Sequence, residues 1–263
     1  MHLAIEAILD YEFVETSDVL LAVEAAAQPD QRVIEQTHII DNAGPLTNKV
    51  GGSGVGRRTW THTGTGRMVS TYRATVEVQR PAVDLAGLRK SLLPSLPEDV
   101  LPFIWPSRYC EADRFGSFVS GHFSNLEGGA LVQALEAWVH ENIAYVPGSS
   151  GIATTAADTF VAQQGVCRDF AHLTAALIRS RDIPARLVSV YALDLDPPDF
   201  HAVVEVWLDG AWHIVDATHM APVETMVRIA VGRDATDIAF MTIFGGAQMN
   251  AQSISVRRVE VPS

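Results

Sequence analysis

The sequence predicts an α+β protein with an N-terminal antiparallel β-sandwich domain (residues 1–90) and a second domain (residues 91–263) that mixes helices with antiparallel strands. Three observations support this. Short runs of alternating apolar and polar residues, separated by turn residues, extend to about residue 80. Two later stretches repeat apolar residues at helical spacing. Two β-type runs joined by Asp209-Gly210 then indicate a hairpin.

The first domain is predicted from its strand patterns. Runs such as LAIEAILDYEF and RMVSTYRATVEV alternate in polarity, and residues 41–45 and 51–54 are loops rich in turn residues. We expect about six strands arranged as a sandwich. Chemically reactive residues are scattered here rather than clustered. These residues are therefore expected to belong to a solvated face.

A proline-studded stretch, residues 81–106, is expected to connect the two domains. Two helices should follow it, the first beginning at Pro106-Ser107. The second lies in GGALVQALEAWVHENIAYVPGSS, where Leu131, Leu135 and Trp138 recur at helical spacing and predict a buried face.

A further helix is predicted to begin at Cys167. Residues 154–164 should form a short helix that Gly165 ends, and the following run CRDFAHLTAALIRSR contains no Gly or Pro. Pro184 prevents its continuation. Cys167 therefore lies in or just before the first helical turn, where free N–H groups and the positive end of the helix dipole favour a thiolate. The buried face is predicted to carry Phe170, Leu173 and Leu177.

The hairpin at Asp209-Gly210 allows a histidine and an aspartate to be placed by strand register. If Leu208 faces Ala211, the numbers of opposing residues sum to 419. Asp216 is then the diagonal neighbour of His201 on the same face of the ribbon, within reach of a longer side chain. A slip of one residue would put the two on opposite faces. The sequence thus predicts a His–Asp pair.

Neighbouring residues are expected to support this chemistry. Asp169 should cap the helix that begins at Cys167, and Arg168 should neutralise its charge. The backbone N–H of Cys167 is the natural first donor to an oxyanion. The second donor stays open among Gln163, Gln164 and Tyr145.

Each of these residues also has an ordinary structural explanation. Buried cysteines are mostly inert packing, and an aspartate at a strand end commonly caps a turn. A helix-start cysteine together with a same-face His–Asp pair favours the catalytic interpretation. His213 alternates to the opposite face from His201, whereas His219 is a reserve candidate for the base.

The motifs GVCRDFAHL and DFHAVVEVWLDGAWHIVDAT resemble the core of bacterial transglutaminase-like proteins, which include proposed cysteine proteases. The resemblance covers about residues 101–245. It implies a transglutaminase-like, papain-like core in which the nucleophile helix packs on an antiparallel sheet. It also implies the roles of the three site residues: Cys167 as nucleophile, His201 as base and Asp216 as its orienter. Many relatives have proline where this chain has Ala217, a difference that bears on the turn.

A Cys–His–Asp site forms a thioester from an amide or ester carbonyl. Water as the second nucleophile makes a cysteine peptidase or deamidase, and an amine makes a transglutaminase. Water is always present and amine specificity needs a second pocket, so hydrolysis is preferred. The alternative is a non-catalytic transglutaminase-like module that binds peptides or serves assembly.

Composition limits the partners and the compartment. The formal net charge is −12 and no basic run occurs, so neither nucleic acid nor membrane is expected as a partner. The expected partner is a protein or peptide substrate, and a homo-oligomer stays open. Two cysteines make no disulfide framework, and with the acidic residues of the first segment they predict a cytoplasmic protein.

No cofactor and no metal ion are expected. The cysteine and histidines outside the predicted triad (Cys110, His122 and His140) match no compact zinc-ligand spacing. Cys110 is expected to be buried and unreactive.

Overall fold

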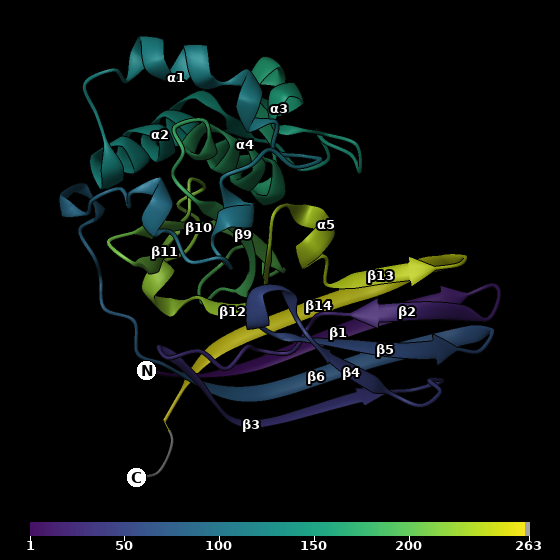
Figure 1. Cartoon of the computed structure of the whole chain (residues 1–263). Coiled ribbons are helices and arrows are strands. Elements are labelled where there is room, and N and C mark those ends of the chain that lie inside the picture. The colour runs from purple at the N-terminus through teal and green to yellow at the C-terminus, as the bar shows by residue number, and fades with distance from the viewer. Residues whose placement is uncertain (261–263) are drawn as a thin grey trace.

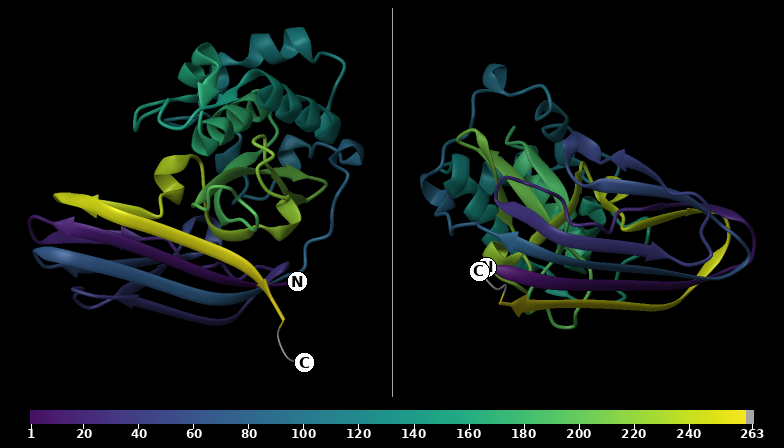
Figure 2. Two further views of the ribbon diagram at one scale, coloured as in Figure 1. Left: turned by 180° about the vertical axis from the view of Figure 1, so that it is seen from behind. Right: turned by 90° about the horizontal axis from the view of Figure 1, so that it is seen from below.

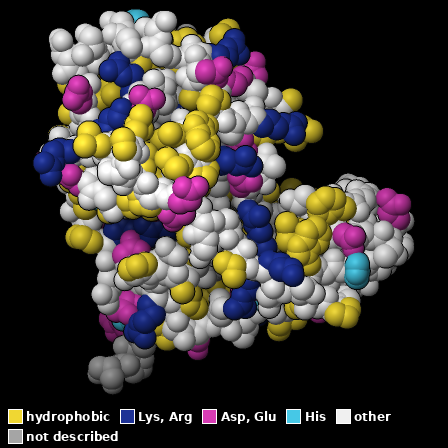
Figure 3. Space-filling model, in the orientation of Figure 1, with side chains coloured by type: hydrophobic (Ala, Val, Ile, Leu, Met, Phe, Trp, Pro, Cys, Tyr) yellow, Lys and Arg dark blue, Asp and Glu magenta, His cyan; other side chains and the backbone are white. Residues whose placement is uncertain are grey.

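The computed structural model describes residues 1–260, which form a layer of long strands with a helical part above it (Figure 1). The views from behind and from below agree that the long strands run under the helical part and project beyond it on one side (Figure 2). The projection leaves a notch between the two parts in the space-filling view (Figure 3). The predicted α+β class is confirmed.

The strand layer is a sandwich of two four-stranded antiparallel sheets, ordered β14-β1-β6-β3 and β13-β2-β5-β4. Six of the eight strands come from the N-terminal stretch, as predicted: β1 (His2–Phe13), β2 (Ser17–Leu21), β3 (Gln31–Ile40), β4 (Thr47–Val50), β5 (Arg57–Thr63) and β6 (Gly66–Val78). In β1 and β6 every second residue is buried over most of the strand, because alternate side chains point to the inner face.

The other two strands return from the far end of the chain. β13 (Met241–Phe244) pairs with β2, and β14 (Ala247–Val259) pairs with β1 along its whole length. Residues 241–259, which the sequence assigned to the second domain, thus pair with strands of the sandwich. The edges of β1 and β2 need partners, and the C-terminal strands supply them. The division near residue 90 stays a prediction.

The upper part is built on a four-stranded antiparallel sheet ordered β11-β10-β9-β12. Its strands are β9 (Ala185–Tyr191), β10 (His201–Leu208), β11 (Ala211–Val215) and β12 (Val227–Gly232). Leu208 pairs with Ala211 and Val204 with Val215, so the predicted hairpin register is confirmed. Every residue of β9 is buried, because the strand lies in the middle of the sheet with both faces covered.

Helices cover one face of this sheet (Figure 1). They are α1 (Gly116–His122), α2 (Gly128–Asn142), α3 (Ala156–Ala162), α4 (Cys167–Arg179) and the short α5 (Ala235–Ile238). One-turn 3₁₀ helices punctuate the connections: η1 (Gly52–Gly54), η2 (Leu85–Gly87), η3 (Leu93–Ser95), η4 (Leu101–Phe103), η5 (Ala112–Arg114) and η6 (Val223–Thr225). A short parallel pair, β7 (Ala144–Tyr145) and β8 (Gln164–Gly165), precedes α4. The predicted helix start at Cys167 is confirmed.

The helix predicted to begin at Pro106-Ser107 starts later. Residues up to 111 are irregular, and regular helix begins only at Gly116. The Ser107 N–H bonds forward to the Cys110 carbonyl, and the Tyr109 N–H donates to the buried Asp234 carboxylate at 3.3 Å. These contacts hold residues 107–110 in an irregular conformation in place of a first helical turn.

The two parts share a hydrophobic core. Tyr191 of β9 and Ile229 of β12 pack in one buried cluster with Leu3 and Leu9 of β1. The burial of these side chains fixes the position of the β11-β10-β9-β12 sheet on the sandwich. Among residues 1–260, no helix is long and apolar enough to cross a membrane.

Candidate active site

Cys167 is the first residue of α4 and is half-buried. The helix start is held by Asp169, whose Oδ2 accepts the Val166 N–H at 2.8 Å. Asp169 is completely buried, and Arg168 Nη2 lies 3.2 Å from its Oδ1. The predicted capping and neutralising roles are confirmed. They fix the N-terminal turn, where N–H groups without helical partners surround the sulfur.

Gly165 permits this arrangement. A Cβ added there would lie 2.6 Å from the Asp169 Cβ, closer than two carbon atoms can pack. The chain must therefore pass Asp169 without a side chain in order to turn into α4 at Cys167.

His201 and Asp216 form the predicted pair. His201 Nε2 lies 2.8 Å from Asp216 Oδ2, and both side chains are almost completely buried. The other oxygen, Oδ1, accepts the Thr218 N–H at 2.9 Å and the Thr218 hydroxyl at 2.8 Å. With both oxygens engaged, the carboxylate has a fixed orientation and holds the imidazole through one ring nitrogen.

The second ring nitrogen of His201 interacts with the Cys167 thiol. Since Nε2 is taken by Asp216, Nδ1 is the ring nitrogen left for the hydrogen bond with Cys167. Burial disfavours the imidazolium, but the hydrogen bonds to Asp216 and Cys167 and their charges outweigh it and raise the pKa of His201 to about 10. The site therefore favours a charged imidazole at neutral pH.

Tyr145 reaches the same sulfur from β7. β7 runs parallel to β8 with Tyr145 paired to Gly165, and the Val146 N–H donates to the Gly165 carbonyl at 2.9 Å. The Tyr145 hydroxyl contacts both the backbone and the side chain of Cys167. Burial, with the negative charge of Cys167, raises the pKa of Tyr145 to about 12, so the hydroxyl keeps its proton at neutral pH.

The other residues considered from the sequence lie elsewhere. Gln163 ends α3 with a left-handed backbone, and Gln164 is exposed. His213 Nε2 contacts the Leu208 carbonyl at 3.2 Å on its own hairpin. His219, the reserve base, pairs with Glu136 instead. Cys110 is fully buried, and burial raises its pKa to about 11.

Thr218 was not assigned a role from the sequence. The signal was present, because an aspartate followed two residues later by a threonine is typical of a turn in which the carboxylate accepts the later N–H. Phe200 directly precedes His201. Its ring stacks on Phe240 at 4.5 Å, which ties the segment before His201 to the core.

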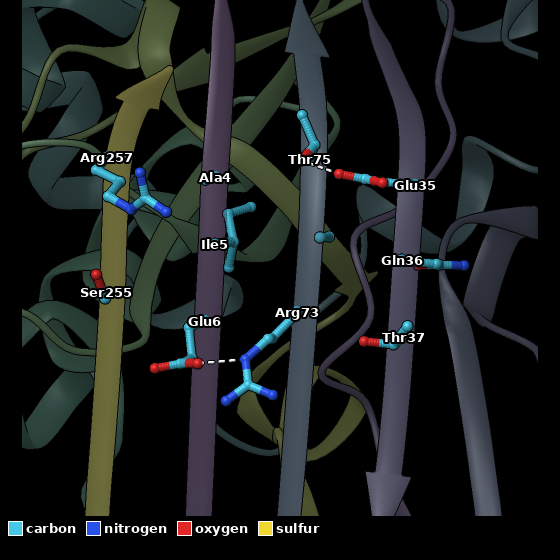
Figure 4. A pocket seen from close by; sticks show the side chains of 11 residues that line it. Ala4, Ile5, Glu6, Glu35, Gln36, Thr37, Arg73, Thr75, Ser255 and Arg257 are labelled. Carbon is cyan, nitrogen blue, oxygen red and sulfur yellow. Dashed lines mark hydrogen bonds and ion pairs between the residues drawn. The ribbon is translucent and has the colours of Figure 1, made fainter. Parts of the chain in front are cut away.

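A hollow of about 440 Å³ lies on the outer face of the sandwich, across β14, β1, β6 and β3 (Figure 4). Glu6 is paired with Arg73 there, and the Thr75 hydroxyl donates to Glu35 at 2.9 Å (Figure 4). No thiol lines it. The candidate active site is the cluster around Cys167.

Comparison with known proteins agrees with the fold. The family model of the transglutaminase-like superfamily matches residues 121–217, which contain Cys167, His201 and Asp216. A solved structure of a proposed cysteine protease from Cytophaga hutchinsonii is 32% identical to this chain, with a TM-score of 0.93. The match covers 100% of this chain and 92% of that protein.

Curated relatives share shorter segments. An uncharacterised protein of Mycobacterium leprae is 33% identical over 126 residues, which cover 44% of each chain. One from Mycobacterium tuberculosis is 29% identical over 82 residues, which cover 31% of this chain and 26% of the relative. The matched part thus spans less than half the length of these curated relatives.

Proposed function

This chain belongs to the transglutaminase-like superfamily, and from that membership we propose that it is a thiol acyl-transfer enzyme acting on amide bonds of a protein or peptide. Cys167 is the nucleophile, His201 the general base and acid, and Asp216 the residue that orients the imidazole. The observation that carries the proposal is the position of His201, buried between the Asp216 carboxylate and the Cys167 thiol.

The first half-reaction follows from these groups. The Cys167 thiolate adds to the carbonyl carbon, and the carbonyl oxygen takes the negative charge. When this intermediate collapses, the carbon–nitrogen bond breaks and His201 gives its proton to the departing amine. The acyl group stays on Cys167 as a thioester, and His201 is left neutral.

The second half-reaction restores the enzyme. Neutral His201 takes a proton from water, the hydroxide adds to the thioester carbon, and the carbon–sulfur bond breaks to release a carboxylic acid. Hydrolysis is the preferred outcome, as in a cysteine peptidase or deamidase, and the proposed activity of the Cytophaga relative supports it. An amine in place of water gives transamidation by the same steps. The free thiol required here suits a reducing, cytoplasmic setting.

The transient oxyanion needs donors beside the sulfur. The backbone N–H of Cys167 is one, and the protonated hydroxyl of Tyr145, which contacts both the backbone and the sulfur of Cys167, is proposed as the other. Tyr145→Phe is expected to lower kcat for amide or ester cleavage about a hundredfold. Iodoacetamide should still alkylate Cys167 at a similar rate, because that displacement forms no oxyanion.

Tyr109→Phe is the matched control for this prediction, since its hydroxyl donates to the Ile152 carbonyl at 2.7 Å rather than to the thiol. Equal activity in the two variants would place the second donor elsewhere.

The proposed nucleophile can be tested without a known substrate. Iodoacetamide is expected to modify Cys167 rapidly well below the ordinary thiol pKa of about 8.5, because the His201 imidazolium stabilises the thiolate. This stabilisation should persist as the pH rises until His201 deprotonates near its pKa of about 10. Cys110 should stay unmodified, since burial raises its pKa to about 11. Mass spectrometry of each cysteine against pH measures both rates.

His201→Ala is the diagnostic variant. Its Cys167 alkylation should follow the titration of an ordinary thiol, since the neighbouring cation is gone. Equal slow reaction at Cys167 and Cys110 in the unmodified protein would contradict the proposal and favour the non-catalytic binding module.

A further inference from the structure

Asp199 lies beside the candidate site and has no role in the proposed thiol chemistry. It lies two residues before His201, in the segment that leads from β9 into β10. Its side chain is exposed, in contrast to the almost completely buried His201 and Asp216. An exposed carboxylate two residues before His201 is available to a molecule bound at the site.

The two oxygens of Asp199 have different surroundings. Oδ1 accepts the Phe200 N–H at 2.7 Å and also a hydrogen bond from the Gln252 side chain. Within residues 1–260, Oδ2 accepts no hydrogen bond from any group and has no cationic partner. The carboxylate is therefore held in place through one oxygen while the other stays available.

The Gln252 anchor comes from the sandwich. Gln252 lies opposite Leu9 in the β14–β1 ladder, and opposing residues share a face of an antiparallel sheet. Leu9 is buried in the core shared with the upper part, so Gln252 also points toward the upper part. β14 therefore reaches across to the segment that carries Asp199.

The charge of Asp199 acts on both groups that flank the sulfur. It contributes to the raised pKa of Tyr145, whose hydroxyl contacts Cys167. Although Asp199 is partly exposed, desolvation by the atoms packed around it raises its pKa, while the hydrogen bonds from Phe200 and Gln252 and the charge of His201 oppose the rise. Asp199 is thus near enough to Tyr145 and His201 to influence a charged group bound beside Cys167.

We propose that Asp199 is a specificity-determining residue whose available oxygen binds a cationic group, an ammonium or a guanidinium, on the molecule that reacts at Cys167. The inference rests on the proposed thiol chemistry. The cation has two sources: a basic side chain of the acyl-donor peptide, or the amine that accepts the acyl group in transamidation. In either case the sandwich takes part in recognition, because Gln252 holds the carboxylate in position.

The first experiment needs no substrate. Methanethiosulfonate reagents with an aminoethyl, a methyl or a sulfonatoethyl group carry positive, no or negative charge and modify the same thiol. Cys167 of the unmodified protein is expected to react faster with the ammonium reagent than with the sulfonate reagent. Asp199→Asn should lower that rate ratio about three- to tenfold, and added salt should reduce the difference.

Two variants distinguish a role of Asp199 in binding a cation from a role in holding its segment in position. The oxygen of asparagine can still accept from Phe200 and Gln252, so Asp199→Asn keeps the anchor and removes the charge. Asp194→Asn removes one charge from the same segment and is the matched control. A merely structural role would change all three rates together and leave the ratio intact. Equal ratios in the two variants would overturn the proposal.

Failure of the thiol chemistry has a different signature, because Cys167 would then react slowly with the uncharged reagent too. Two sets of substrates then identify the source of the cation. The first is a pair of acyl-donor peptides that carry either lysine or norleucine at one position, and the second is a set of amines with charged or neutral tails. If Asp199→Asn changes the preference between the two acyl donors, the cation is a basic side chain of the peptide. If it changes the preference between the two kinds of amine, the cation belongs to the amine that accepts the acyl group. Insensitivity in both sets would overturn the recognition role.

Discussion

Cys167→Ala is expected to abolish acyl transfer, with kcat falling at least about ten-thousandfold. The thioester cannot form without the sulfur, and neither His201 nor Asp216 can replace it. The substitution removes one half-buried atom from a helix start and adds no strain, so the fold should survive. Release of the amine from a peptide, or of the alcohol from an activated ester, measures the loss, and circular dichroism against temperature measures folding.

Cys110→Ala is the control for this experiment. Cys110 is fully buried, so its removal should cost some stability while activity stays. Unfolding of the Cys167→Ala variant would identify Cys167 as a structural cysteine, and residual acyl transfer near the original rate would place the nucleophile elsewhere.

Glu205→Gln is expected to cause the largest loss of stability, about 3–5 kcal/mol. Glu205 lies on β10 with no exposed surface, and its oxygens accept from Arg186 Nε at 2.8 Å and Arg228 Nε at 2.5 Å. Arg228 also bonds Asp30 before β3, at 2.7 Å. Removing one negative charge leaves the buried Arg186 guanidinium without its carboxylate partner and Arg228 with Asp30 alone, at the junction of the sandwich and the β11-β10-β9-β12 sheet.

Denaturant unfolding measures this effect as a shift of the midpoint. Glu6→Gln is the matched surface variant, because Glu6 pairs with Arg73 on the solvent-exposed outer face of the sandwich, where ion pairs contribute little (Figure 4). Similar midpoint shifts in the two variants would mean that the buried network is dispensable. Since β10 begins at His201, a weakened β10 should also lower the reactivity of Cys167 toward iodoacetamide.

The centre of the candidate site was predictable because its geometry is local. The start of α4 follows from Gly165 and the run after Cys167, and the closeness of His201 and Asp216 follows from a two-residue turn. Tyr145 could be named only as one of three candidate donors. Its contact with Cys167 depends on the pairing of β7 with β8, whose two-residue strands carry no periodic signal.

Long-range pairing explains the remaining differences. The run SISVRRVEV, which begins at Ser253, indicates a strand but not its partner, and β14 pairs with β1 at the other end of the chain. The same pairing brings Gln252 to Asp199, a contact that no spacing within either segment implies.

The sequence by itself determined the class of fold, the helix that presents Cys167, and the register that joins His201 to Asp216, because turn and capping preferences act over a few residues. Only the tertiary structure decided which strands close the sandwich, which hydroxyl meets the thiol, and which carboxylate stands beside it. Those choices depend on the burial of surfaces that are far apart along the chain, and that free energy belongs to the packed molecule rather than to any one segment.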